Sequence, residues 1–165
     1  TREYVFNGFL FSTEFARRCA ASGINIGNAV ETPDATDAWQ MNVQILALCN
    51  EQRQNNGLEK LMTREDLWEQ VAQVRAGEIV NYFSHTRPNG SNCFSLYDEA
   101  GLDYRAAGEN IAAGYYGASA VVDGWMNSTG HRANILSESY DYLATGYATG
   151  GAYGTNYCQN FLGDW

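Results

Sequence analysis

The sequence predicts an α+β domain with a layered α/β/α arrangement. Segments with helical periodicity fill most of residues 37–136, and only one short apolar segment among them is typical of a strand. Residues 142–161 alternate between apolar and polar side chains, as a hairpin does. The chain has 165 residues, of which 45% are hydrophobic, so it is long enough for one domain with its own core.

The first helix of this domain is expected from about residue 37 to residue 54. Asp37 is the expected N-cap, and Asn55-Asn56-Gly57 is typical of a helix end. The residues expected to face the core are Met41, Ile45, Leu48 and Cys49.

A second helix is expected after Thr63-Arg-Glu-Asp66, which has the layout of a capping box with a shortened acid. The Glu78 carboxylate lies in line with the apolar stripe of this helix. A carboxylate in that position needs a charged partner or a place at the edge of a cleft. Arg75, one turn before this carboxylate, is the nearest candidate partner. The predicted stripe is Leu67, Val71, Val74 and Glu78.

Shorter elements are expected in the second half of the chain. They are a turn-rich loop at 83–92, a short helix at 93–100, a strand at 108–114, a helix at 119–130 and a helical turn at 131–136. Ser119 is the expected N-cap of the longer of these helices. The hairpin at 142–161 is expected to turn at Gly150-Gly151.

Residues 1–33 are interpreted as a helical appendage and linker before the main domain at 34–165. Tyr4 to Ala21 has helical apolar spacing, and the polar stretch around Pro33 is typical of a linker. One short helical unit cannot bury its own apolar face, so it must pack on the main domain or belong to a larger module. The chain begins at Thr1, and we expect any export signal to lie outside this sequence.

The net charge of −9 argues against binding to nucleic acid or to anionic membranes, because both require basic patches. Lys and Arg total only 10 and do not cluster. No segment is long and apolar enough to predict a membrane span. Nucleic-acid binding is therefore not expected.

Four cysteines occur at wide separations, without a CxxC motif, which argues against a thiolate zinc site. Their even number indicates two disulfides in an oxidising compartment. Three pairings are open, and we favour Cys19–Cys49 with Cys93–Cys158. The alternative is free, buried thiols.

The chain has two histidines, His85 and His131, and both lie among turn-forming residues. Glu109 lies between them, beside a glycine at the start of the predicted strand. Two imidazoles and one carboxylate could form a three-ligand metal site with an open position. Spacing alone does not show that the three converge, and hydrogen bonds within turns are the simpler interpretation.

No nucleophile accompanies these groups. Ser84 adjoins His85 and Ser128 precedes His131, but adjacency in sequence does not create the geometry between hydroxyl and imidazole that nucleophilic catalysis needs. The GxSxG motif is absent. A serine hydrolase is therefore not expected.

Three phrases occur in order, YFSHTRPNG at 82–90, AGENIAA at 107–113 and GWMNSTGHRANIL at 124–136. Together they resemble the bacterial branch of the CAP superfamily, also called SCP-like or cysteine-rich secretory protein, antigen 5 and pathogenesis-related-1. The resemblance covers residues 37–161. It implies an α/β/α sandwich with a central antiparallel sheet, and a shallow cleft around His85, Glu109 and His131. It also implies that these three residues bind a divalent cation, for which zinc, calcium and magnesium are the candidates.

The chain departs from the pattern of the eukaryotic members, which carry a second glutamate shortly after the corresponding tryptophan. Trp125–Ser128 contains no acid. This departure predicts a lower metal affinity. Glu78 is a candidate for the missing charge, with pairing to Arg75 as the alternative, and Ser128 is a further candidate cleft residue.

The segment Glu3–Ile24 resembles the end of a short helical module of bacterial surface proteins, which would make this chain the C-terminal part of a longer exported protein. The preferred hypothesis is a secreted or cell-surface monomer that binds an unknown ligand or protein partner without catalysis and without an organic cofactor. The alternative is a metal-dependent hydrolase or peptidase that uses the same cleft. In a third interpretation, the domain is a structural spacer.

Overall fold

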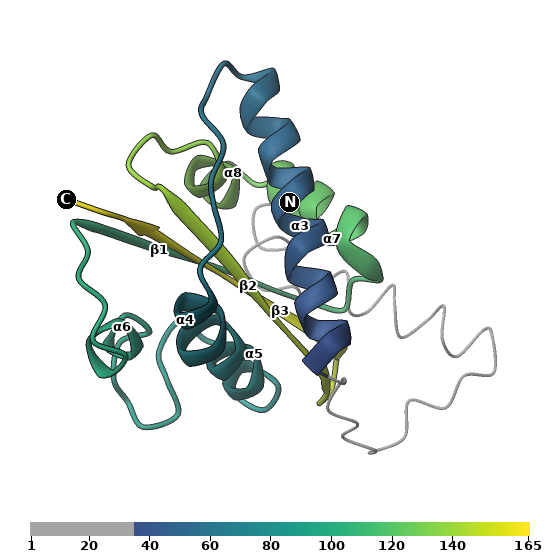
Figure 1. Cartoon of the computed structure of the whole chain (residues 1–165). Helices are drawn as coiled ribbons and strands as arrows, with labels where there is room; N and C mark the ends of the chain where they lie inside the picture. The colour runs from purple at the N-terminus through teal and green to yellow at the C-terminus, as the bar shows by residue number, and fades with distance from the viewer. Residues whose placement is uncertain (1–34) are drawn as a thin grey trace.

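The computed structural model describes residues 35–165 and contains a three-stranded antiparallel sheet between two layers of helices (Figure 1). The strands are β1 (Ala106–Ala113), β2 (Tyr142–Gly150) and β3 (Gly154–Gly163), in the spatial order β1-β3-β2. The predicted α+β class and the sandwich with a central antiparallel sheet are therefore confirmed. The predicted helical appendage, and its boundary with the main domain at residues 33–34, lie outside the described residues.

The strands β2 and β3 form the predicted hairpin, with Gly150 opposite Gly154. Gly150, Gly151 and Gly154 have φ angles of 115°, 66° and 77°, a region that other residues rarely adopt, so these glycines allow the turn. On its other side β3 pairs with β1, from Gly163 opposite Ala106 to Asn156 opposite Ala113. Among residues 35–165 no strand pairs with the other side of β1.

One face of the sheet is covered by α3 (Ala35–Asn55), α7 (Gly117–Met126) and α8 (Thr129–Ile135). The predicted inward stripe of α3 is confirmed, because Ile45 and Cys49 are fully buried and Met41 and Leu48 pack against the same core. This core also contains residues from the sheet and from α7: Tyr157, Phe161, Leu143, Val121 and Trp125.

Both predicted N-caps in this layer are wrong. The helix α3 begins at Ala35, so Asp37 lies inside its first turn. There its carboxylate interacts favourably with the positive end of the helix dipole. The helix α7 begins at Gly117, whose φ of 80° lets the chain enter the helix directly after Tyr116. Ser119 therefore lies within the helix.

The other face is covered by α4 (Glu65–Leu67), η1 (Trp68–Ala72), α5 (Gln73–Ile79) and α6 (Ser95–Glu99). The segment η1 is a π-helical turn, which is wider than an α-helical turn and shifts the positions that follow it. Leu67 and Val71 are buried as predicted, but Val74 is 40% exposed. The inward position after the π turn belongs to Arg75, which is fully buried.

The N-cap of α4 is Arg64 and not Thr63, so the predicted capping box is wrong as well. Asp66 accepts hydrogen bonds from the Arg64 side chain at 2.6 and 3.0 Å. This short-range pair competes for the carboxylate that a capping box would require.

The cysteines at 49, 93 and 158 are free, buried thiols, so the predicted Cys93–Cys158 disulfide is wrong. The Sγ atom of Cys158 lies 3.3 Å from Glu109 Oε2 and donates to it. Cys49 accepts a hydrogen bond from Gln159, and its predicted partner Cys19 lies outside the described residues. Burial raises the pKa of the Cys49 and Cys93 thiols to about 12, so both stay protonated at neutral pH.

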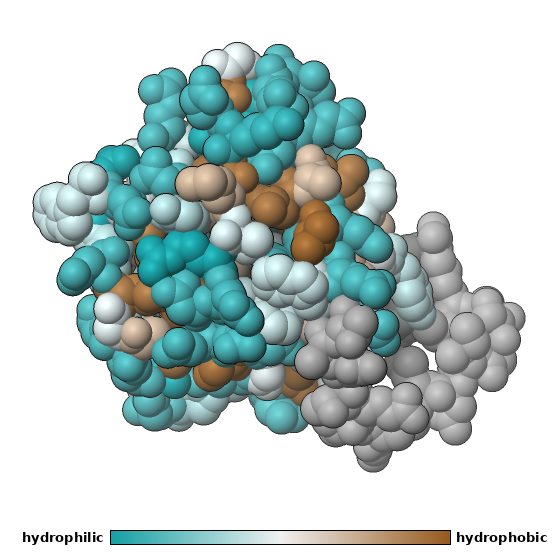
Figure 2. Space-filling view, viewed as in Figure 1, coloured by the Kyte–Doolittle hydropathy of each residue, from teal (hydrophilic) through white to brown (hydrophobic). Residues whose placement is uncertain are grey.

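Within residues 35–165 no helix has the length and apolar character needed to span a bilayer. Figure 2 shows hydrophilic residues over most of the described part of one face, with smaller apolar groups near its middle.

Gly146 lies on β2 where the strand passes over η1. A Cβ atom at this position would lie 1.9 Å from the carbonyl oxygen of Ala72. We expect Gly146→Ala to lower the free energy of unfolding by about 1–3 kcal/mol or more, because the backbone of η1 must move. Urea denaturation at neutral pH measures this change.

The matched control is Gly77→Ala, because a Cβ atom at Gly77 would meet nothing within 4 Å. Alanine is preferred over glycine inside a helix, so this variant should gain about 0.5–1 kcal/mol. Equal unfolding free energies for the two variants would contradict the close packing of β2 on η1.

Candidate functional site

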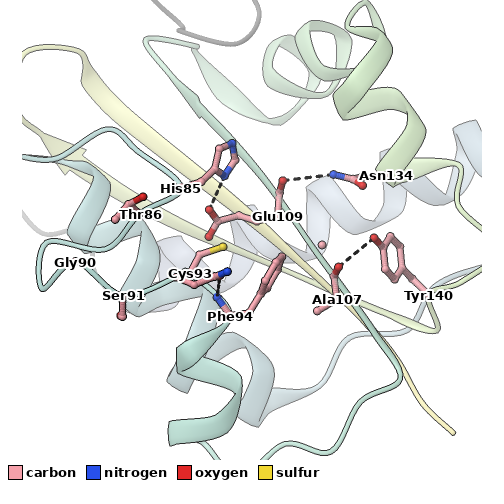
Figure 3. A pocket seen from close by; sticks show the side chains of 12 residues that line it. His85, Thr86, Gly90, Ser91, Cys93, Phe94, Ala107, Glu109, Asn134 and Tyr140 are labelled. Carbon is pink, nitrogen blue, oxygen red and sulfur yellow. Dashed lines mark hydrogen bonds and ion pairs between the residues drawn. The ribbon is translucent and has the colours of Figure 1, made fainter.

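A cleft of about 570 Å³ opens beside the unpaired side of β1 (Figure 3). One wall is the loop that follows α5, and the other is formed by Asn134 of α8 and by Tyr140. The β1 strand contributes Ala107, Gly108 and Glu109. The remaining lining residues are His85, Thr86, Gly90, Ser91, Asn92, Cys93 and Phe94.

His85 and Glu109 meet in this cleft, and Figure 3 shows the imidazole turned toward the carboxylate. The Nδ1 atom of His85 lies 2.8 Å from Oε1 of Glu109. The His85 side chain is 49% exposed, whereas that of Glu109 is only 1% exposed. The cleft therefore presents the imidazole to solvent and hides the carboxylate behind it.

Arg75 holds the Glu109 carboxylate from the side of α5. Its Nε donates to Oε2 at 2.8 Å and its Nη2 donates to Oε1 at 3.2 Å. Burial alone would raise the pKa of Glu109, but the hydrogen bonds with His85 and Arg75 outweigh it and hold the pKa below its usual value. Glu109 is therefore ionised at neutral pH and is a poor general acid.

The ion pairs continue from Arg75 into the loop. Glu78 accepts from Arg75 Nη1 at 2.6 Å and from Arg87 Nη2 at 2.8 Å. Arg87 also donates to Glu99 of α6 at 2.6 Å. Glu78 is not among the lining residues of the cleft, and its pairing with Arg75 agrees with the alternative interpretation of this carboxylate.

His131 lies on α8, is 3% exposed, and is not among the residues that line the cleft. Burial, together with a smaller contribution from the charge of His85, lowers its pKa to about 4. Ser128 is the N-cap residue of α8 and is also buried and outside the lining. Of the predicted cleft residues, the fold thus brings His85 and Glu109 into direct contact.

The described side chains do not fit the three-ligand metal centre of His85, Glu109 and His131. Among residues 35–165 no group of three or more His, Cys, Asp or Glu side chains is arranged to hold a metal ion. Both oxygens of Glu109 already accept from the Arg75 guanidinium, whose positive charge opposes a cation at the same atoms. Metal binding at this cleft stays a prediction.

Sequence reasoning missed Tyr140 and the roles of Asn134 and Arg75. Asn134 Nδ2 donates to the backbone oxygen of Glu109 at 3.4 Å, and Tyr140 Oη donates to that of Ala107 at 3.3 Å. Gly108 permits the second contact, because a Cβ atom there would lie 2.5 Å from Tyr140 Oη. The available signals were Asn134 inside the phrase at 124–136 and the glycine beside Glu109; none marked Tyr140.

Comparison with known proteins finds a family match over most of the domain. The model of the CAP family, described as the Cysteine-rich secretory protein family, matches residues 46–161. The Uncharacterized protein YkwD of Bacillus subtilis (strain 168) is 33% identical over 150 residues. The alignment covers 90% of this chain and 56% of that relative, so the chain spans little more than half of the relative's length.

Two solved structures also match the fold of this chain. An extracellular protein containing a SCP domain from Bacillus anthracis str. Ames matches with a TM-score of 0.70 and 31% identity, over 82% of this chain and 45% of that one. An outer surface protein from Borrelia burgdorferi matches with a TM-score of 0.71 and 16% identity, over 83% of this chain and 100% of that one. The second match shows a shared fold alone.

Replacing Arg75 tests the ion pairs beneath the cleft. Arg75→Met leaves the buried Glu109 without its guanidinium, so we expect the free energy of unfolding to fall by about 3–5 kcal/mol at neutral pH. In a Glu109→Gln background the same change should cost clearly less. Arg64→Met is the control, because the Arg64–Asp66 pair is 31% and 37% exposed and should contribute less than about 1 kcal/mol. Equal costs in the two backgrounds would contradict the Arg75–Glu109 coupling.

His131 should make stability depend on pH. Its pKa is about 4 in the folded state and about 6.5 when unfolded. As the pH falls below about 6.5, the unfolded state therefore binds a proton before the folded state does. The free energy of unfolding should fall by about 2 kcal/mol between pH 7.5 and pH 5. Urea denaturation with a chelator present measures this loss. It should largely vanish in His131→Gln and persist in His85→Gln, and a persistent loss in His131→Gln would contradict the assignment.

Proposed function

Because this chain belongs to the cysteine-rich secretory protein family, CAP, we propose that it is an extracellular or cell-surface domain whose cleft binds a ligand or protein partner without transforming it. One observation carries this proposal: the Glu109 side chain is 1% exposed and is fully engaged by Arg75 and His85. The cleft surface consists mainly of uncharged groups from Thr86, Ser91, Asn134 and others. Such a surface is suited to recognition by hydrogen bonds.

The chemistry around His85 supports binding over acyl transfer. The Ser84 hydroxyl accepts a hydrogen bond from the Thr86 backbone, so it is held by the loop and not by the imidazole. Cys93 is buried with a raised pKa, which disfavours a thiolate nucleophile. The extracellular location rests on the similar protein from Bacillus anthracis str. Ames, which is described as extracellular.

A second candidate is a hydrolase that uses the same cleft, with His85 as general base. The contact of His85 Nδ1 with Glu109 favours it, because a carboxylate on Nδ1 orients the ring and leaves Nε2 to take a proton. In this candidate Arg75 fixes the carboxylate and the buried His131 stays neutral.

Nuclear magnetic resonance of the ¹⁵N-labelled protein tests for ligand binding in the cleft. Capped uncharged peptides and N-acetylated chito-oligosaccharides serve as probes. Binding should shift the resonances of Thr86, Ser91 and Asn134, and His85→Ala should weaken it about tenfold, as loss of a central contact does. Glu51→Gln on the exposed side of α3 is the control and should bind normally.

The same samples are assayed for turnover of peptides, glycans and esters, with and without zinc, calcium or magnesium. Measurable turnover that disappears in His85→Ala would contradict the binding proposal and support the hydrolase. Turnover that also requires a metal would support the metal-dependent form.

A further inference from the structure

The unpaired side of β1 faces the cleft with its backbone. Gly114, directly after β1, donates its N–H to Thr155 of β3, so by the alternation of antiparallel pairs the even-numbered residues of β1 bond to β3. The odd-numbered residues carry their N–H and C=O groups outward. Two contacts confirm this direction, because Asn134 and Tyr140 reach the carbonyl oxygens of Glu109 and Ala107.

This edge is open over a short stretch only. Ile111, Ala112 and Ala113 are 2%, 4% and 0% exposed. Glu109 as a whole residue is 7% exposed although its side chain is 1% exposed, so its remaining surface is mostly backbone. Ala107 is partly exposed and lines the same cleft. The cleft therefore offers the main chain of Ala107 and Glu109.

The two carbonyl groups are held by weak contacts. The distances from Tyr140 Oη to Ala107 O and from Asn134 Nδ2 to Glu109 O are 3.3 and 3.4 Å, longer than most hydrogen bonds of their types. A carbonyl oxygen also has a second lone pair. Gly108, between them, adds no side chain over the edge. An incoming N–H could join or replace either contact at little cost.

The pairing of the charged side chains in and beside the cleft indicates which class of ligand fits it. Glu109 is paired with Arg75 and His85, and the neighbouring Glu78 and Arg87 are paired with each other. The cleft thus offers hydrogen-bonding groups and no unpaired carboxylate or guanidinium among its lining residues. An uncharged ligand with regularly spaced donors and acceptors fits best, and an extended peptide backbone repeats both at every second residue.

We propose that the cleft captures an uncharged, extended peptide segment, which adds as a short strand to the β1 edge through the backbone of Ala107 and Glu109. This inference rests on the proposed function, because it names the ligand class of the same cleft. His85, Thr86 and Ser91 then lie along the loop wall, where they contact side chains of the peptide.

Amide hydrogen exchange of the ¹⁵N-labelled protein tests the alternation. The probe is a pool of capped pentapeptides randomised over Ala, Ser, Thr, Val and Asn, from which the tightest member is taken. At about ten times its Kd, this peptide should slow exchange of the Ala107 and Glu109 amides about tenfold. The Gly108 amide, which faces β3, is the internal control and should show little additional protection.

N-methylation of the peptide provides an independent readout. Methylation at alternate positions should abolish binding, whereas methylation at the intervening positions should leave it within about threefold, since those N–H groups face away from β1. Ala107→Pro removes one outward N–H from an edge strand, a position where proline is tolerated, and should also abolish binding. Its melting temperature checks the fold, and the N-methyl series stands without this variant.

Each outcome is decisive. A peptide that shifts Asn134 and Tyr140 but gives no alternation in exchange or N-methyl tolerance overturns strand addition. A chito-oligosaccharide that shifts the cleft residues, when no pooled peptide does so at millimolar concentration, overturns the peptide class and leaves the proposed function standing. If neither probe shifts any cleft resonance, both proposals fail.

Discussion

A guanidinium without exposed surface is the constraint on which the site depends. Arg75 is completely buried, and a buried charge is tolerated only when it is paired and hydrogen-bonded. Its donors reach Glu109 on β1, Glu78 on its own helix and the carbonyl of Ser84 in the loop, at 2.6 to 3.2 Å. Burial alone would lower the pKa of Arg75, but the hydrogen bond and charge of Glu109 raise it above its usual value. One side chain thereby fixes helix, strand and cleft wall together.

The alternation of β1 distributes the remaining polar groups between the two layers. Glu109 points to the face covered by α5, and the next residue, Asn110, points to the face covered by α8. There Asn110 donates to the His131 carbonyl and to Gln159, and accepts from Asn134. Because successive strand residues point to opposite faces, Glu109 and Asn110 serve two different networks. The helix α8 is thus held against the strand through its backbone and through the side chain of Asn134.

Periodicity predicted the elements well and their ends less well. The β2–β3 hairpin and the α3 stripe followed from side-chain alternation and spacing, because both continue without interruption. The prediction that Val74 faces the core was wrong because of the π turn η1, since one wider turn shifts the direction of every later residue. The same shift buries Arg75 in the core, which the sequence pattern did not predict. The predicted Cys93–Cys158 disulfide was wrong: both thiols are free, and each lies beside the Glu109 carboxylate. Only the family resemblance predicted that His85 lies near Glu109, because no rule of helix or strand spacing relates residues 24 positions apart.

An open strand edge needs protection, and proteins commonly use charge, proline or a covering element for it. Here the protection at Ala107 and Glu109 consists of two neutral side chains, Tyr140 and Asn134, at long hydrogen-bond distances. Tyr140 stacks on Phe161, with ring centroids 5.2 Å apart, so its position is set by the core and not by the carbonyl that it touches. Such contacts satisfy the edge without filling the cleft. This arrangement therefore leaves the strand able to accept one short segment, at the place where its backbone meets solvent in the cleft.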